Sequence, residues 1–215
     1  MARAREPEQR RARIRLAALL IGILLVLPSV TAGFFGDDYL QIAQLEKWSP
    51  SSANPLDLYA FVPRSRARAA RLHDLGLLPY FAAERLQIAF VRPLSSALMW
   101  ADHAVFGRSP VGYHVHTLVW YVVFLVAGCA LLTRTLPSSL ATPAAVIFCL
   151  CAAHAMPATW VAARTSIVTT ALALLAWLAH RRWRPARWRW ARSAISSPGS
   201  SAGVDRAGGG RWRRR

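Results

Sequence analysis

The sequence predicts an all-α, polytopic membrane protein with about four transmembrane helices and a helical external loop domain. The 215 residues are 54% hydrophobic and yet carry a formal net charge of +17, a combination that is unusual for a soluble domain. The positive charge is concentrated at the ends: six arginines lie in residues 1–15 and eleven from residue 181 onward, whereas residues 37–116 are nearly neutral. Basic ends that flank apolar runs are typical of the cytoplasmic segments of membrane proteins. Because no nucleic-acid-binding motif accompanies the arginines, we expect the lipid bilayer, and no nucleic acid, as a partner.

The first predicted span covers residues 16–36 and follows a basic cytoplasmic N-terminus, residues 1–15. About 20 apolar residues are enough to cross the hydrocarbon core as a helix. A cleavable signal peptide is the alternative, but its apolar core is usually shorter, and the small-residue site after Ser29 is weak. We therefore expect an uncleaved span of the inner membrane, with the residues that follow on its outer face.

Residues 37–115 are predicted to form an external loop domain, because they are too many and too mixed for a plain connector. Ser, Asn and Pro make residues 48–55 a turn-rich break. Residues 94–106 have apolar side chains at helical spacing and predict an amphipathic helix that Gly107 ends. Such helices favour a domain lying on the membrane.

Three further spans are predicted at residues 116–136, 140–158 and 165–180. The third is short and contains Pro157, so we expect it to be tilted or broken. Four crossings return the chain to the cytoplasm, where the basic tail of residues 181–215 is expected to be disordered beside anionic headgroups. The three cysteines fall inside apolar runs without metal-ligand or disulfide spacing, which is typical of small buried side chains.

Asp37 and Asp38 are the candidate catalytic residues, since they follow the first span at the water–lipid boundary. A carboxylate there can accept a proton from an acceptor hydroxyl, and an acidic pair can hold a divalent cation against a phosphate. The simpler alternative is a solvated turn or a helix N-cap. No other cofactor and no protein-bound metal is indicated.

Four basic side chains are candidates for binding a phosphate: Arg92, His114, His154 and Arg164. Arg92 precedes Pro93 and is suited either to an anion or to a simple helix start. His114 opens the second span, but it shares no helix face with His116, which argues against a metal site made by these two. The last two lie at the outer end of the third span, where they indicate a lipid-phosphate site or a packed helix end.

These motifs occur in an order that resembles the bacterial GT-C-type polytopic membrane glycosyltransferases, above all their dolichyl-phosphate-mannose mannosyltransferase-like members. The series is Gly-Asp-Asp-Tyr at 36–39, FxRPLSS at 90–96, FGxxPxGYH at 106–114 and HAxPxxWxAxR at 154–164, within a match over residues 16–184. The resemblance implies transfer of a sugar from a polyprenyl-phosphate-linked donor to an acceptor on the outer face of the membrane. It assigns the catalytic role to Asp37 or Asp38 and the donor phosphate to the four basic residues.

The chain departs from this pattern in two places. Similar proteins often carry an acid at the position of Met156 and Asp or Asn at the position of Ser166. Full-length members also have more spans, so the resemblance is to their N-terminal portion. The alternative is a non-catalytic, truncated membrane protein or assembly subunit with a polybasic lipid-binding tail.

Overall fold

The computed structural model describes residues 5–47, 54, 56–62, 65–83 and 86–196, with the backbone alone at residues 5, 6, 68 and 184–196. This part of the chain is mostly helical, as the sequence predicts. The elements in chain order are α1 (Arg5–Val26), η2 (Leu27–Thr31), α2 (Asp37–Leu45), β1 (Ala60–Val62), α3 (Arg66–Asp74), β2 (Ile88–Ala89), α4 (Pro93–Phe106), α5 (Pro110–Thr135), α6 (Ser138–Cys149), η3 (Ala152–His154), α7 (Ala155–Thr159), η4 (Val161–Arg164) and α8 (Thr165–Ser196). The chain divides into two compact units, residues 1–178 and 179–215.

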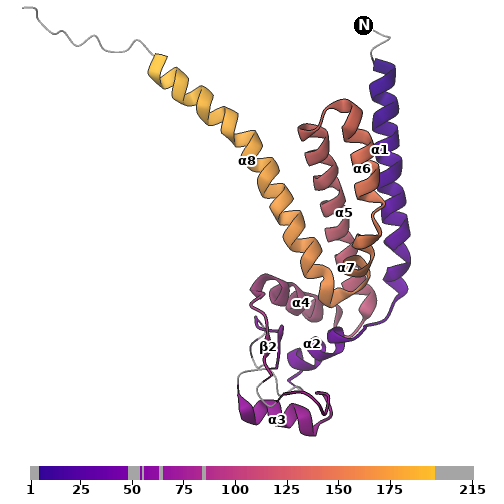
Figure 1. Ribbon diagram of the computed structural model, residues 1–215, viewed down its shortest axis with the longest axis vertical. Coiled ribbons are helices and arrows are strands. Elements are labelled where there is room, and N and C mark those ends of the chain that lie inside the picture. The colour runs from indigo at the N-terminus through magenta and orange to yellow at the C-terminus, as the bar shows by residue number, and fades with distance from the viewer. Residues whose placement is uncertain (1–4, 48–53, 55, 63–64, 84–85, 197–215) are drawn as a thin grey trace, which may run out of the picture. The chain divides into compact units, whose positions relative to one another are not determined.

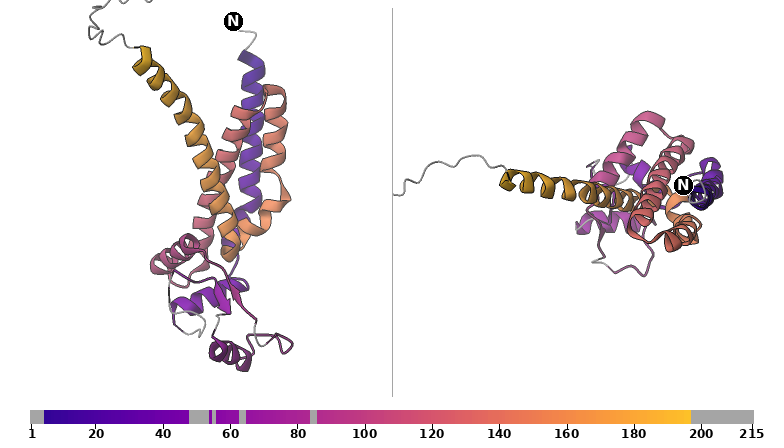
Figure 2. Two further views of the ribbon diagram at one scale, coloured as in Figure 1. Left: turned by 60° about the vertical axis from the view of Figure 1, so that its left-hand side comes forward. Right: turned by 90° about the horizontal axis from the view of Figure 1, so that it is seen from above.

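Within the first unit, α1, α5 and α6 lie side by side as a helical bundle (Figure 1). Its core consists of small and apolar side chains from these helices and from α7 and the start of α8: Ala18, Val26, Tyr121, Phe124, Leu125, Cys149, Ala158, Ile167 and Ala171. The remaining elements, α2, β1, α3, β2 and α4, gather at the end of the bundle where α5 begins, as Figure 2 also shows. We call residues 32–109 the loop domain.

Three stretches are long and apolar enough to cross a membrane: Pro7–Thr31, Pro110–Thr135 and Val161–Trp183. The pair Ser138–Cys149 and Ala152–Thr159 would make a fourth span, bent by 43°. The bend lies where the helical hydrogen bonds stop at Leu150, ahead of the expected break at Pro157. Many large apolar side chains of these stretches are exposed, among them Leu24, Leu25 and Val119. Extended apolar surface of this kind fits a multi-pass membrane protein.

The observed ends of the helices differ from the predicted ones. α1 begins at Arg5 because Arg, Glu and Gln are good helix formers and extend the helix beyond its apolar part. α5 begins at Pro110, which starts a helix without losing a hydrogen bond. α8 continues to Ser196, so the tail expected to be disordered from residue 181 is helical up to that point. The rest of the expected tail, residues 197–215, lies outside the described residues.

The contact between α1 and α6 depends on Gly22. A Cβ at this position would lie 2.5 Å from the carbonyl oxygen of Cys149. Membrane helices use small residues in this way to bring their backbones together.

We therefore predict that Gly22→Ala lowers the free energy of unfolding by about 1–3 kcal/mol, because α6 must move away from α1. Gly33→Ala is the matched control, since a Cβ there meets no atom within 4 Å. Thermal unfolding in detergent would measure both, and equal melting temperatures for the two variants would contradict the predicted close contact.

The loop domain has its own core, which joins it to the bundle. Ile42, Leu58, Tyr59, Met99 and Tyr113 are buried together with Val161 of η4. β1 and β2 form a small antiparallel pair in which Ala60 faces Ala89. Because the last two core residues belong to α5 and η4, this core fixes α2 and α4 against the end of the bundle.

Candidate functional site

Asp38 connects the start of α2 with η4. Its Oδ1 accepts a hydrogen bond of 2.7 Å from the Ala162 N–H, and its Oδ2 accepts one of 3.0 Å from the Phe35 N–H. The side chain is fully buried. Burial raises the pKa of the Asp38 carboxyl above its usual value, although the two amides and His114 act in the opposite direction. Asp38 thus ties together parts of the chain that are far apart in sequence.

Asp37 lies on a different face of α2 and is half-buried. It lines a cavity of about 570 Å³ whose wall comes from α2, β1, α3, β2 and the segment between α3 and β2. Among the described residues of that wall, Asp37 alone is charged. The others include Leu40, Phe61, Leu72 and Phe90. A carboxylate at the edge of an apolar cavity is suited to accept a proton from a bound hydroxyl group.

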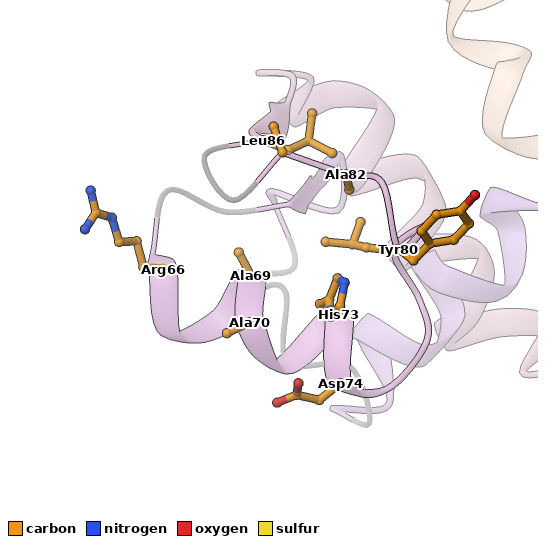
Figure 3. A pocket seen from close by; sticks show the side chains of 10 residues that line it. Arg66, Ala69, Ala70, His73, Asp74, Tyr80, Ala82 and Leu86 are labelled. Carbon is orange, nitrogen blue, oxygen red and sulfur yellow. The ribbon is translucent and has the colours of Figure 1, made fainter.

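A second cavity, also of about 570 Å³, lies beside α3. It shares Leu78, Ala82, Ala83 and Leu86 with the first, so the segment that follows α3 separates the two. Figure 3 shows His73 below Tyr80 on one side of this second cavity, with Arg66 extending away from it. Both cavities lie in the loop domain.

Arg92 is a candidate phosphate-binding residue that contacts the wall of the Asp37 cavity. Its guanidinium carbon lies 4.9 Å from the centre of the Phe90 ring and 5.0 Å from that of the Tyr59 ring. Phe90 is part of the cavity wall. Stacking on two aromatic rings leaves the hydrogen-bond donors of the guanidinium at its edge, where an anion can approach.

Of the other three candidates, His114 and Arg164 are buried and His154 is half-buried. The Nε2 of His114 lies 3.4 Å from the carbonyl oxygen of Gly33, and the ring is buried. His154 packs edge-on against Phe124, with ring centres 4.9 Å apart, and also contacts Tyr121 and Phe148. The sequence predicts that these side chains share one cationic site. In the structure each of them contacts different residues, and they do not form a single site.

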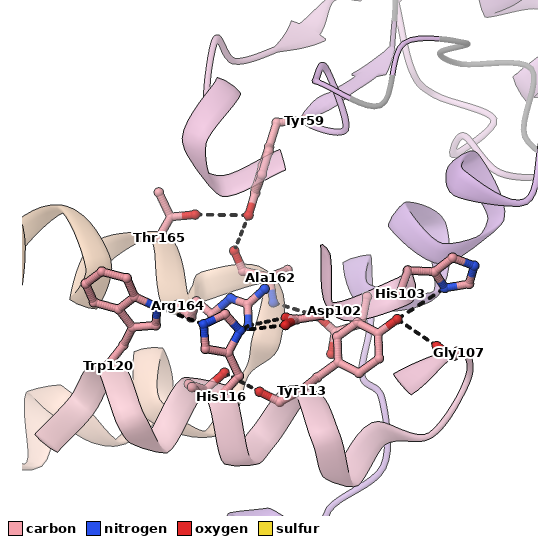
Figure 4. Close-up of polar contacts among 12 residues, drawn as sticks. Tyr59, Asp102, His103, Gly107, Tyr113, His116, Trp120, Ala162, Arg164 and Thr165 are labelled. Carbon is pink, nitrogen blue, oxygen red and sulfur yellow. Dashed lines mark hydrogen bonds and ion pairs between the residues drawn. The ribbon is translucent and has the colours of Figure 1, made fainter. Parts of the chain in front are cut away.

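Arg164 belongs to a buried network that joins η4, α4 and α5 (Figure 4). Its Nη1 lies 2.5 Å from Oδ2 of Asp102, and Oδ1 of Asp102 lies 2.5 Å from Nδ1 of His116. The indole N–H of Trp120 donates to Nε2 of His116 over 3.0 Å. Since Nε2 is an acceptor here, the ring proton sits on Nδ1 and is donated to Asp102. The network therefore contains a carboxylate, a guanidinium and an imidazole.

Two tyrosines complete the junction between the loop domain and the bundle. The Tyr59 hydroxyl donates to the Ala162 carbonyl over 3.1 Å and accepts from the Thr165 hydroxyl over 2.9 Å. The Tyr113 hydroxyl donates to the Gly107 carbonyl over 2.7 Å and accepts from His103 over 3.2 Å. All of these groups hold α4 and β1 in place at the ends of α5 and α8.

Asp102 is the site residue that the sequence argument missed. A signal was present, since Ser95 and Asp102 lie on one face of a helix whose other residues are mainly apolar. A polar stripe on an otherwise apolar helix marks a side that needs hydrogen-bond partners. Within the described residues, no three His, Cys, Asp or Glu side chains are grouped so that they could hold a metal ion.

An exposed ion pair connects the end of α2 with the segment that follows α4. Arg108 donates to both carboxylate oxygens of Glu46, over 2.6 and 2.5 Å. These hydrogen bonds lower the pKa of Glu46 below its usual value of 4.5. A carboxyl whose pKa is lowered by folding stabilises the fold above that value, and this contribution is lost as the pH falls through the folded-state pKa.

We predict that the wild-type melting temperature falls more steeply below pH 4.5 than that of Glu46→Gln, which has no carboxyl to protonate. Added salt should reduce the difference between the two proteins, because the pair is near solvent. The control is Asp74→Asn, an exposed acid at the end of α3. Identical acid dependence in wild type and Glu46→Gln would disprove the contribution of this pair.

No protein-family model matches the chain, and neither the curated proteins nor the solved structures contain a significant match to it. The assignment of a function therefore depends on the residues and on the geometry described above.

Proposed function

We propose that this chain is the N-terminal part of an inner-membrane glycosyltransferase that uses a polyprenyl-phosphate-linked sugar. In this proposal the loop domain lies on the outer face, and both basic ends lie in the cytoplasm, in line with the excess of arginine at those ends. Asp37 accepts the proton of the acceptor hydroxyl, whose oxygen attacks the anomeric carbon. The bond from that carbon to the phosphate oxygen breaks, and the polyprenyl phosphate leaves with the electron pair.

The observation that carries the proposal is the position of Asp37. Asp37 is the charged member of a described wall whose other side chains, apart from Gln44, are apolar, around a cavity of about 570 Å³. It is also close in sequence to the end of the first candidate span, Pro7–Thr31. A substrate delivered from the lipid meets a base there without crossing bulk water. The neighbouring Asp38 is fully buried with both oxygens hydrogen-bonded to backbone, so of the two acids Asp37 is the one with access to a substrate.

Arg92 is the residue we assign to the departing phosphate. It stacks on Phe90 of the cavity wall, and a guanidinium can bind phosphate oxygens in pairs. His114 and Arg164 are buried, and His154 lies among aromatic rings. In this proposal these three support the fold around the site.

The test uses the purified chain in liposomes with polyprenyl-phosphate mannose or polyprenyl-phosphate glucose, each labelled in the sugar, and a membrane extract as the source of acceptor. Transfer of label, with release of an equal amount of polyprenyl phosphate, would support the proposal. The background is the transfer of label measured in liposomes without the chain. Absence of transfer above that background with both donors would overturn the proposal for this chain.

One observation favours a second candidate, a non-catalytic membrane protein or assembly subunit. Two of the four basic residues expected at the donor phosphate are buried, and Arg164 is paired with Asp102. In a non-catalytic chain these buried contacts would only stabilise the fold. Such a chain would show no transfer of sugar but would be purified in a stable complex with another membrane protein. The liposome assay and purification in mild detergent separate the two candidates.

A further inference from the structure

The helix α4 is inverted relative to an ordinary surface helix. The side that faces the protein is polar: Ser95, Ser96 and Asp102 are buried there beside Met99. The side that faces away from the protein contains only apolar residues, among them the exposed Leu94, Trp100, Ala104 and Val105. Trp100 is 53% exposed and Val105 is 73% exposed. In a helix surrounded by water the two sides would be exchanged.

Two residues on the polar side of α4, Ser96 and Asp102, bind other parts of the chain. Ser96 accepts a hydrogen bond from the Leu58 N–H over 3.2 Å, and Asp102 holds both His116 and Arg164. These contacts fix the rotation of the helix about its own axis. The apolar side is therefore turned outward by the structure itself, and the helix cannot roll to bury it without breaking the Asp102 network.

The end of α4 contacts α5, which belongs to a candidate span. Phe106, at the end of α4, packs so closely on Gly112 of α5 that a Cβ at Gly112 would overlap its ring. α5 itself has a stripe of exposed valines at helical spacing: Val111, Val115, Val119 and Val126. Figure 1 shows α4 lying across the end of the bundle at which α5 begins. Apolar side chains are thus exposed on both of the helices that meet at Gly112.

We infer that α4 lies in the membrane interface, with its outward side in contact with lipid acyl chains of the leaflet next to the loop domain. The absence of charge on that side, within the described residues, suits hydrocarbon, and a tryptophan is the residue preferred where hydrocarbon meets headgroups. The loop domain is then attached to the bilayer by α4 as well as by the spans. This holds the Asp37 cavity at a fixed height above the lipid, and it does not depend on the activity proposed above.

The inference is tested with three single substitutions in the full chain in liposomes: Trp100→Cys, Val105→Cys and Tyr80→Cys. Tyr80 is 89% exposed and lies on the loop after α3, so it serves as the water-facing control. Labelling by a membrane-impermeant maleimide is measured above that of the parent chain. Since maleimide reacts with the thiolate, which forms where water reaches, we expect labelling at the two α4 positions to be about tenfold slower or more than at Tyr80.

A second measurement identifies what covers the helix. A fluorescent label at Val105, attached before reconstitution, should be quenched by phospholipids that carry a nitroxide on their acyl chains, and the same label at Tyr80 should not. Rapid maleimide labelling at both α4 positions would overturn the inference, because that side would then face water. Slow labelling without quenching by the lipid nitroxide would also overturn it, since a protein would then cover the side. Val105 is at the exposed end of α4, so its substitution removes no buried contact.

Discussion

Asp38→Ala is expected to lower the free energy of unfolding by about 3 kcal/mol or more, because it leaves the amides of Phe35 and Ala162 without an acceptor. The Ala162 bond joins residues 124 positions apart, so its loss should loosen the loop domain from η4. Asp38→Asn should have an intermediate effect, since its carbonyl oxygen can accept one hydrogen bond but its NH₂ group faces the other donor.

The matched comparison is Asp37→Asn, which changes the adjacent acid. Asp37 is half-buried at the cavity edge, and surface changes of this size usually alter stability by about 0.5 kcal/mol or less. Thermal or denaturant unfolding of the purified proteins in detergent would measure both variants. Equal stability of Asp38→Ala and Asp37→Asn would contradict the structural role given to Asp38.

Arg164→Met is expected to cost about 3–5 kcal/mol, because it leaves the Asp102 carboxylate buried without its positive partner. The reverse change, Asp102→Leu, should be similarly damaging, since Arg164 is only 3% exposed. When both are replaced together, neither charge remains unpaired, and an apolar pair of similar volume can pack in their place.

A double-mutant cycle measures this coupling. We expect the double variant Asp102→Leu/Arg164→Met to be more stable than the sum of the single effects predicts, by up to about 3 kcal/mol. A control cycle uses Arg108 and Glu46, whose exposed pair should show a much smaller coupling. Strict additivity at Asp102 and Arg164 would show that the ion pair contributes nothing specific to the junction of α4 with η4.

The helical class and the apolar spans could be predicted from the sequence because they depend on local composition. The apolar run around Leu20 and the one around Val123 are each long enough to cross a membrane as a helix. The ends of the helices were less predictable. α1 extends back to Arg5 and α8 forward to Ser196 because helix-forming residues continue the helix beyond the apolar part, and hydropathy alone does not show this.

The candidate site was predictable in part. The motif around Gly36 marks the start of α2, and the positive φ of Gly36, +53°, is a conformation that glycine adopts easily. Which of the two following acids faces the cavity depends on how α2 packs on η4, a contact between segments far apart in the chain. The role of Arg164 also depends on a contact between distant segments, because its partner Asp102 lies on α4 and belongs to none of the sequence motifs.

The most direct test of the central claim is the rate of sugar transfer by Asp37→Asn in liposomes, compared with wild type and with Asp74→Asn. The latter removes an exposed acid from α3 and serves as the matched control. We predict that Asp37→Asn lowers the rate by about a hundredfold or more while its melting temperature stays that of the wild type, because only the proton acceptor is lost. Transfer by Asp37→Asn at the wild-type rate would contradict the claim that Asp37 is the base.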